Sequence, residues 1–440
     1  AITSLMGSSG AALGKDGNNF VIPGFENLFS LMKIKDIYES GEYDRIIVDC
    51  APTGETLSLL KLPELLTWYM EKFFPVGKVM VRVLAPVSKV KYKVTLPTHQ
   101  AMNEIEEMHA IPAARYLARR KRQNLLLGLL ALVALCMLLL GVSVGNGVVR
   151  LPLGFSEHEL ALFVRLRLPR VLMGALVGAG LAMSGTLAQA VLRNPLASPF
   201  TLGISSGAAF GAALAILLGG ASQWGMAGNA FVFAALTAFA ALGFARLRDS
   251  RPETLILGGV AIMFLFSAAT SLLQYVATEY QVQAIVFWGF GNLGRVGWSE
   301  LGMAAVMILL PVPFALKLSW DLNALLAGEE TASSLGVNVR RLRIGGILAA
   351  SLMAAGAICF TGVIGFIGLV APHIARLALG AEHRFLIPGA ALFGASLVTF
   401  SDVLARNICP PQIIPIGILT SFLGVPFFFW LLMRKGQNHA

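Results

Sequence analysis

Long apolar runs constrain this chain more than any other feature of its sequence. Between residues 123 and 434, stretches of about 20 mostly apolar residues follow one another, each long enough for a helix to cross a bilayer. Only 13% of the 440 residues are charged, whereas soluble domains carry about 25%. We therefore expect an all-α polytopic membrane protein with about ten transmembrane helices. The candidate spans are 123–143, 169–192, 199–219, 225–246, 253–277, 299–318, 341–360, 363–380, 385–407 and 413–434.

Basic residues predict how these spans are oriented. The net charge is +10, and Lys and Arg gather at the ends of apolar runs, as is typical of cytoplasmic loops rather than of nucleic-acid binding. The segment before the first run is strongly basic, and so are the loops after the fourth, sixth and eighth runs and the tail. This pattern predicts cytoplasmic N- and C-termini and no nucleic-acid partner. The stretch RLRLPR (165–170) breaks the pattern, because it puts three arginines on the outer side, which marks it as a candidate functional segment.

Small residues predict where helices pack closely. Gly174 and Gly178 are spaced by four on the second candidate span, and Gly203, Gly207 and Gly211 repeat this spacing on the third. Glycines at this spacing let helix backbones approach one another. We expect these positions to serve bundle packing more than the lining of a pathway.

The chain changes character near residue 112. We predict an incomplete α/β segment over 1–111, a basic linker over 112–122 and a ten-helix domain over 123–436. A short predicted strand ends at Asp49 and is followed by a turn through Gly54, an arrangement that suits a nucleotide site where the acid helps to hold Mg²⁺. An ordinary strand-to-turn junction explains it equally well.

The stretch DCAPTGET (49–56) and its surroundings resemble the arsenite-pump and tail-anchored-protein-targeting ATPase family over roughly 20–109. A phosphate-binding loop of the form G-x-x-x-x-G-K-[ST] is missing: the nearest match, SGAALGKD (9–16), has Ser9 in place of Gly and Asp16 in place of Ser or Thr. An Asp there would repel phosphate and remove the hydroxyl ligand of Mg²⁺. We therefore expect that this segment does not hydrolyse ATP.

Catalytic and metal-binding patterns are missing from the apolar part. It contains no HExxH motif, no nucleophile elbow and no cluster of acids, and none of the four cysteines forms a CxxC pair. We expect no catalytic residues, no metal site and no cofactor in this chain. Asp402 is the main acid within the spans, and Arg406 lies one helical turn later, so the two predict an ion pair that is either structural or functional.

Six stretches, in order, resemble the iron-chelate and vitamin B12 permease family of ABC importers over about 120–436. They lie at 167–212, 256–273, 287–298, 326–343, 362–384 and 401–432. The resemblance implies the permease subunit of a binding-protein-dependent importer in the prokaryotic inner membrane. It would carry a metal chelate of the iron–siderophore, haem or cobalamin class. It also implies two separate ATPase subunits that bind ATP and Mg²⁺, an extracytoplasmic substrate-binding protein, and a second permease copy, most simply as a homodimer.

The resemblance also assigns three sites. The first is an ATPase-coupling loop: Gly328, Glu329, Glu330, Thr331, Ala332, Leu335, Gly336 and Val337. The second is a docking site for the binding protein, formed by Arg167, Arg170 and Arg406, for which snorkelling toward lipid headgroups is the alternative explanation. The third is a cytoplasmic gate formed by Asn194, Leu196 and Thr254.

Two other function classes stay open at this stage. A membrane-anchored ATPase of the arsenite-pump type would give residues 1–111 the working role. An ion-coupled secondary transporter would need acids embedded in the membrane, which the spans almost entirely lack. The sequence does not name the substrate, and oxyanions such as molybdate remain open beside the chelates.

Overall fold

The computed structural model describes residues 99–145, 148–149, 156–219, 222–247 and 252–436. The chain divides into two units, 1–114 and 115–440, and the second contains almost all of the described residues. The predicted strand before Asp49 and the degenerate loop at 9–16 lie outside the described residues. The predicted domain boundaries therefore stay predictions.

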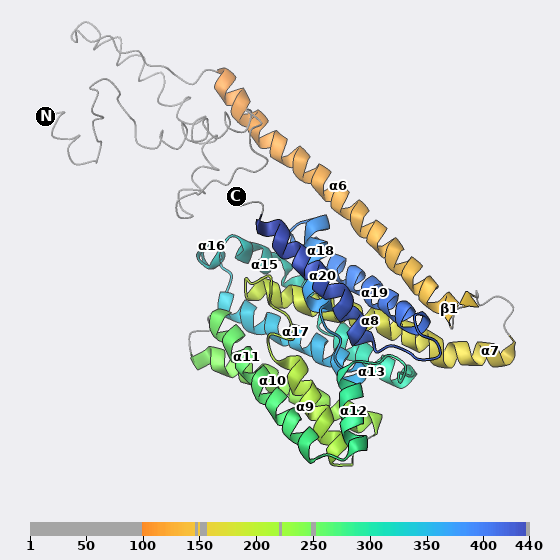
Figure 1. Ribbon diagram of the computed structural model, residues 1–440. Helices are drawn as coiled ribbons and strands as arrows, with labels where there is room; N and C mark the ends of the chain where they lie inside the picture. The colour runs from red at the N-terminus through yellow and green to blue at the C-terminus, as the bar shows by residue number, and fades with distance from the viewer. Residues whose placement is uncertain (1–98, 146–147, 150–155, 220–221, 248–251, 437–440) are drawn as a thin grey trace, which may run out of the picture. The chain divides into compact units, whose positions relative to one another are not determined.

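The described part is almost entirely helical (Figure 1). Among the described residues the two strands are β1 (Val144–Gly145) and β2 (Val148–Val149), which pair antiparallel in a short hairpin after the first long helix. The helices are α6 (His99–Ser143), α7 (Glu157–Leu162), α8 (Leu168–Val191), α9 (Ile204–Leu217), α10 (Gln223–Leu247), α11 (Pro252–Val276), α12 (Glu279–Gly289), α13 (Trp298–Leu309), α14 (Val312–Lys317), α15 (Ser319–Leu326), α16 (Glu329–Ser334), α17 (Val339–Thr361), α18 (Ile367–Leu379), α19 (His383–Asn407) and α20 (Ile416–Gly436).

Seven stretches of the described helices are long and apolar enough to cross a membrane. They are Leu117–Ser143, Glu157–Val191, Gln223–Gly243, Glu253–Val276, Trp298–Lys317, Val339–Thr361 and His383–Asn407. Three shorter apolar helices, Ile204–Leu217, Ile367–Leu379 and Ile416–Phe427, fall within the remaining three candidate spans. These helices confirm the prediction of a helical, multi-pass membrane protein. Helices suit a bilayer because a chain in lipid must satisfy its backbone polar groups internally.

Helix α8 is the centre of the second unit, and α17, α18 and α19 contact it (Figure 1). Glycines let its neighbours approach. A Cβ atom on Gly178 would collide with the backbone of Gly394 on α19, and one on Gly185 would collide with the backbone of Gly368 on α18. The close packing predicted for Gly178 is therefore confirmed.

The third candidate span, residues 199–219, also packs closely through its glycines. Gly207 and Gly211 of α9 face α10, where a Cβ on either glycine would collide with Thr237 or with the main chain at Asn229. Gly203, which has φ +76°, is the N-cap of α9 and lies against Gly259 of α11. The glycines of this span thus hold a three-helix group together, as their spacing predicted.

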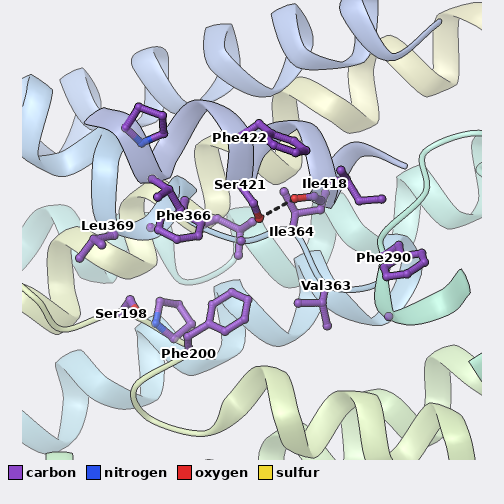
Figure 2. A pocket seen from close by; sticks show the side chains of 18 residues that line it. Ser198, Phe200, Phe290, Val363, Ile364, Phe366, Leu369, Ile418, Ser421 and Phe422 are labelled. Carbon is purple, nitrogen blue, oxygen red and sulfur yellow. Dashed lines mark hydrogen bonds between the residues drawn. The ribbon is translucent and has the colours of Figure 1, made fainter. Parts of the chain in front are cut away.

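A cavity of about 750 Å³ lies between α20 and the loops that precede α9, α13 and α18 (Figure 2). Its wall is mostly apolar, and four phenylalanines and two serines stand out in it: Phe200, Phe290, Phe366, Phe422, Ser198 and Ser421. The loop before α18 can turn into the cavity wall because Gly362 and Phe366 both have positive φ, +72° and +67°. Gly417 and Gly424 let α20 lie close to this loop.

Candidate functional site

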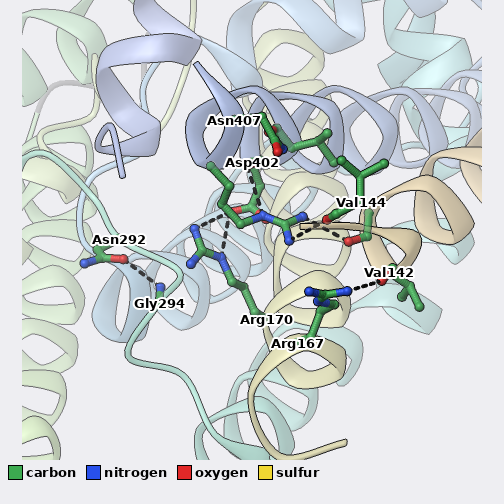
Figure 3. Close-up of polar contacts among 11 residues, drawn as sticks. Val142, Val144, Arg167, Arg170, Asn292, Gly294, Asp402 and Asn407 are labelled. Atoms are coloured by element: carbon green, nitrogen blue, oxygen red, sulfur yellow. Dashed lines mark hydrogen bonds and ion pairs between the residues drawn. The ribbon is translucent and has the colours of Figure 1, made fainter. Parts of the chain in front are cut away.

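An arginine cluster surrounds Asp402 at the N-terminal end of α8 (Figure 3). Arg170 donates from Nε and Nη2 to Asp402 Oδ1, at 2.9 and 2.8 Å. Arg406 Nε lies 3.0 Å from Asp402 Oδ2, but its N–H donates to the Asp402 main-chain carbonyl at 3.3 Å. The contact of Arg406 with Oδ2 is therefore an ion pair rather than a hydrogen bond. The predicted pair of Asp402 and Arg406 is confirmed, and Arg170 is an additional partner.

Two arginines of the cluster, Arg406 and Arg167, cap the C-terminal end of α6. Arg406 donates from Nη1 to Val144 O at 3.1 Å and from Nη2 to Gly141 O at 3.0 Å, while Arg167 Nη1 donates to Val142 O at 3.2 Å. The last carbonyls of a helix have no partner within it, and a cation there also complements the negative end of the helix dipole. The cluster therefore joins α6, α8 and α19 as well as concentrating charge.

The structure brings the three predicted docking residues together, but in different environments. The side chains of Arg170 and Arg406 are 12% and 8% exposed, and that of Asp402 is 2% exposed. Arg167 is half-buried and lies in a π-helical turn, Phe163–Arg167, between α7 and α8. One carboxylate and three guanidinium groups leave the cluster with an excess of positive charge.

At the other end of α8 lies the predicted coupling loop, which forms helix α16 between two glycines with positive φ, Gly328 (+116°) and Gly336 (+87°). Ala332 is fully buried beneath it, and Val337 N donates to Ala332 O at 3.0 Å, which closes the loop. Its outward residues are exposed: Glu330, Ser333, Ser334, Leu335 and Gly336. Thr331 and Glu329 are half-buried. The loop is thus a short projection whose outer face is exposed.

Arg343 of α17 fastens this projection to the bundle. Its Nη2 atom lies 2.7 Å from Glu329 Oε1, and its Nε donates to Val191 O, the last residue of α8, at 3.3 Å. Arg343 is buried, with 4% of its surface exposed. Arg343 belongs to none of the three sites predicted from the sequence. Its two contacts reach residues 14 and 152 positions away in the sequence, so local spacing does not predict them.

The predicted gate residues lie on two elements. Asn194 and Leu196 belong to the turn that follows α8, where Asn194 Oδ1 accepts from Leu196 N at 2.9 Å and Arg193 takes a positive φ of 48°. Leu196 is 49% exposed. Thr254 lies half-buried in the first turn of α11, and no hydrogen bond within the described part of the chain joins it to the turn.

Comparison with known proteins assigns both parts of the chain. The FecCD transport family matches residues 126–434, and a second family, the anion-transporting ATPases, matches residues 4–116. Both resemblances stated from the sequence are thus confirmed, the second over a longer stretch than expected.

Individual relatives agree with the first match. The hemin transport system permease of Yersinia pestis is 39% identical over 63% of this chain and 85% of its own length. The Fe(3+)-citrate import system permease of Bacillus subtilis is 37% identical over 72% and 98%. A solved structure assigned to the metal-chelate type of ABC transporter, in an inward-facing conformation, has a TM-score of 0.66 and 35% identity, covering 70% of this chain and 99% of its own. The chain belongs to the FecCD transport family.

Proposed function

We propose that this chain is the membrane-spanning permease subunit of a binding-protein-dependent ABC importer for a metal chelate of the iron–siderophore, haem or cobalamin class. The observation that carries the proposal is the family match over 126–434, which coincides with the helical unit described above. The relatives are named for hemin and Fe(3+)-citrate, and both substrates are iron chelates. Residues of this unit form a different site at each end of α8.

The separation of these sites fits opposite membrane faces. Arg170 and Val191 are 21 residues apart on α8, which at 1.5 Å per residue is about 30 Å. That is the thickness of a bilayer core. We assign the arginine cluster to the outer face and α16 to the cytoplasmic face, with all ten apolar stretches crossing the membrane and both termini inside.

Two ATPase subunits are proposed as partners, one for the α16 helix of each permease copy. The exposed outer face of α16 would offer Glu330 and Leu335 to a groove on the ATPase subunit, while buried Ala332 anchors the helix to the bundle. ATP and Mg²⁺ would bind in those subunits, and no cofactor is assigned to this chain. On the outer face, the excess positive charge around Arg167, Arg170 and Arg406 would steer acidic groups of a substrate-binding protein into register.

Transport would follow alternating access between two copies of the permease. Nucleotide-driven movement of α16 would open or close a pathway between the copies, narrowed on the cytoplasmic side by Asn194, Leu196 and Thr254. The homodimer is the simplest assembly, because one chain then supplies both halves of the pathway. The chain itself would break no covalent bond.

A membrane-anchored ATPase is the second candidate, and the family match at 4–116 favours it. The degenerate sequence at 9–16 speaks against it, since Asp16 takes the place of the Mg²⁺-binding hydroxyl. The purified chain alone should neither bind ATP tightly nor hydrolyse it.

The deciding experiment uses the full chain with the ATPase subunits and binding protein encoded beside it, reconstituted in liposomes. We expect the binding protein to stimulate ATP hydrolysis and to drive uptake of one labelled chelate among haem, cobalamin and a ferric siderophore. Hydrolysis by the chain alone would support the second candidate. Uptake that continues without ATP would instead support an ion-coupled transporter.

A further inference from the structure

We infer that Arg343 is a positioning residue that transmits movement of α16 to the turn carrying Asn194 and Leu196. The inference rests on the proposed role of α16 as the ATPase-docking element. Arg343 lies on α17, outside both the coupling loop and the gate, and would connect the two.

The guanidinium group of Arg343 holds both elements at once. One nitrogen, Nη2, pairs with Glu329, the first residue of α16, at 2.7 Å. Another, Nε, donates to the carbonyl of Val191, the last residue of α8, at 3.3 Å. The turn with Asn194 begins one residue later, and Asn194 N donates back to Gln189 O at 3.1 Å, so the turn and the end of α8 form one hydrogen-bonded piece.

The burial of Arg343 makes this link stiff. Glu329 is one partner of this buried charge, and separating a buried charge from a partner is destabilising, so Glu329 and Arg343 should move together. The guanidinium is planar, with its donors in a fixed fork, and a shift of one bonded partner therefore changes the geometry offered to the other. A lysine, with one flexible ammonium group, could not reproduce this arrangement.

Close packing next to Arg343 restricts movement of the end of α8 relative to α17. A Cβ atom on Gly346, three residues after Arg343 on α17, would lie 2.6 Å from Val191 Cγ1. The same end of α8 is held from another side, because Arg376 of α18 donates from Nη2 to Gln189 Oε1 at 3.2 Å. Val191 is thus enclosed by helices, and Arg343 is the group that connects it to the exposed α16.

The test measures substrate transported per ATP hydrolysed in the reconstituted complex, for wild type, Arg343→Gln, Arg343→Lys and Glu329→Gln. We expect this ratio to fall about fivefold or more in Arg343→Gln, in the range of coupling energies between linked sites. Arg343→Lys should recover part of it at most. Glu329→Gln should lower the ratio as well, and the double variant should be no worse than the worse single variant, because both remove the same link.

Arg341→Gln is the matched control. Arg341 is exposed and lies two residues away on α17, so it faces a different side of the helix and should keep the wild-type ratio. Co-purification of the ATPase subunits and thermal stability are measured for every variant. Should Arg343→Gln fail to fold, Glu329→Gln and Arg343→Lys still decide the question, because Glu329 is 39% exposed and lysine keeps the charge.

The outcomes separate the two proposals. A wild-type ratio in both Glu329→Gln and Arg343→Lys, or an equal fall in Arg341→Gln, would overturn the role of Arg343 while leaving the importer intact. Failure of the wild-type chain to recruit any ATPase subunit would overturn the proposed function, and this inference with it.

Discussion

Arg170 and Asp402 are 232 residues apart in the sequence and form a buried ion pair, with Arg170 Nη2 2.8 Å from Asp402 Oδ1. The pair joins α8 to α19 beside the carbonyl end of α6, which Arg406 and Arg167 cap. Structural and docking roles therefore overlap in one cluster. Substitutions at single members of the cluster separate the two roles.

Asp402→Asn should destabilise the protein, because it leaves two arginines with low exposure without their counter-charge. Removing one partner of a buried pair costs about 3–5 kcal/mol. Thermal unfolding of the detergent-solubilised chain measures the change as a fall in Tm. Glu157→Gln, at an exposed residue of α7, is the control and should shift Tm little. An unchanged Tm for Asp402→Asn would show that the cluster is not a structural element.

Arg167→Glu should impair docking of the binding protein and should lower stability less than Asp402→Asn does. The side chain is half-buried, and it donates one hydrogen bond, to Val142 O, among the described residues. Charge reversal at an interface rim mainly slows association and reduces its dependence on salt. The measurement is binding-protein-stimulated ATP hydrolysis at several ionic strengths.

Arg165→Glu, an exposed neighbour in the same π-helical turn, is the matched control for docking. If both reversals reduce stimulation equally, the effect is one of general surface charge. Arg170→Glu should differ from both, because it places a second carboxylate against Asp402 and should lower stability as well as docking.

Gly185→Ala should disturb the contact of α8 with α18, since the added methyl group would collide with the backbone of Gly368. Overpacking of this kind costs about 1–3 kcal/mol. Gly243→Ala, on α10, is a suitable control, because no atom lies within 4 Å of the new methyl group and alanine favours a helix over glycine. Thermal stability should fall for the first variant and stay level or rise for the second. The reverse order would contradict the packing described for α8.

Leu335→Ala should weaken recruitment of the ATPase subunits. Leu335 is 64% exposed at the tip of the α16 loop, so its truncation removes little packing within the chain. Burying an exposed leucine side chain in such an interface contributes more than about 1 kcal/mol, or roughly a fivefold change in affinity. Co-purification of the subunits at several concentrations measures it. Leu218→Ala, at a residue 75% exposed after α9, should change nothing. Equal recruitment by Leu335→Ala and wild type would place the ATPase contact elsewhere.

The helical membrane architecture could be predicted from the sequence because its cause is local. A run of about 20 apolar residues in lipid has to satisfy its own backbone hydrogen bonds, and a helix does this within the run. The same locality explains why the pair of Asp402 and Arg406 was predicted, since residues four apart share a helix face. Glycine spacing likewise predicted close packing at Gly178 and Gly207, although it did not identify Gly394 or Thr237 as the neighbours.

Only the tertiary structure decided which distant groups meet. Arg170 faces Asp402, and Arg343 joins Glu329 to Val191, because α8 runs through the centre of the unit and brings its two ends to different partners. The cavity beside α20 is built from five separate segments for the same reason. A sequence records which side chains can form ion pairs and hydrogen bonds. Helix packing alone determines which of them come within reach, since contacts between distant segments depend on how the whole bundle fills space.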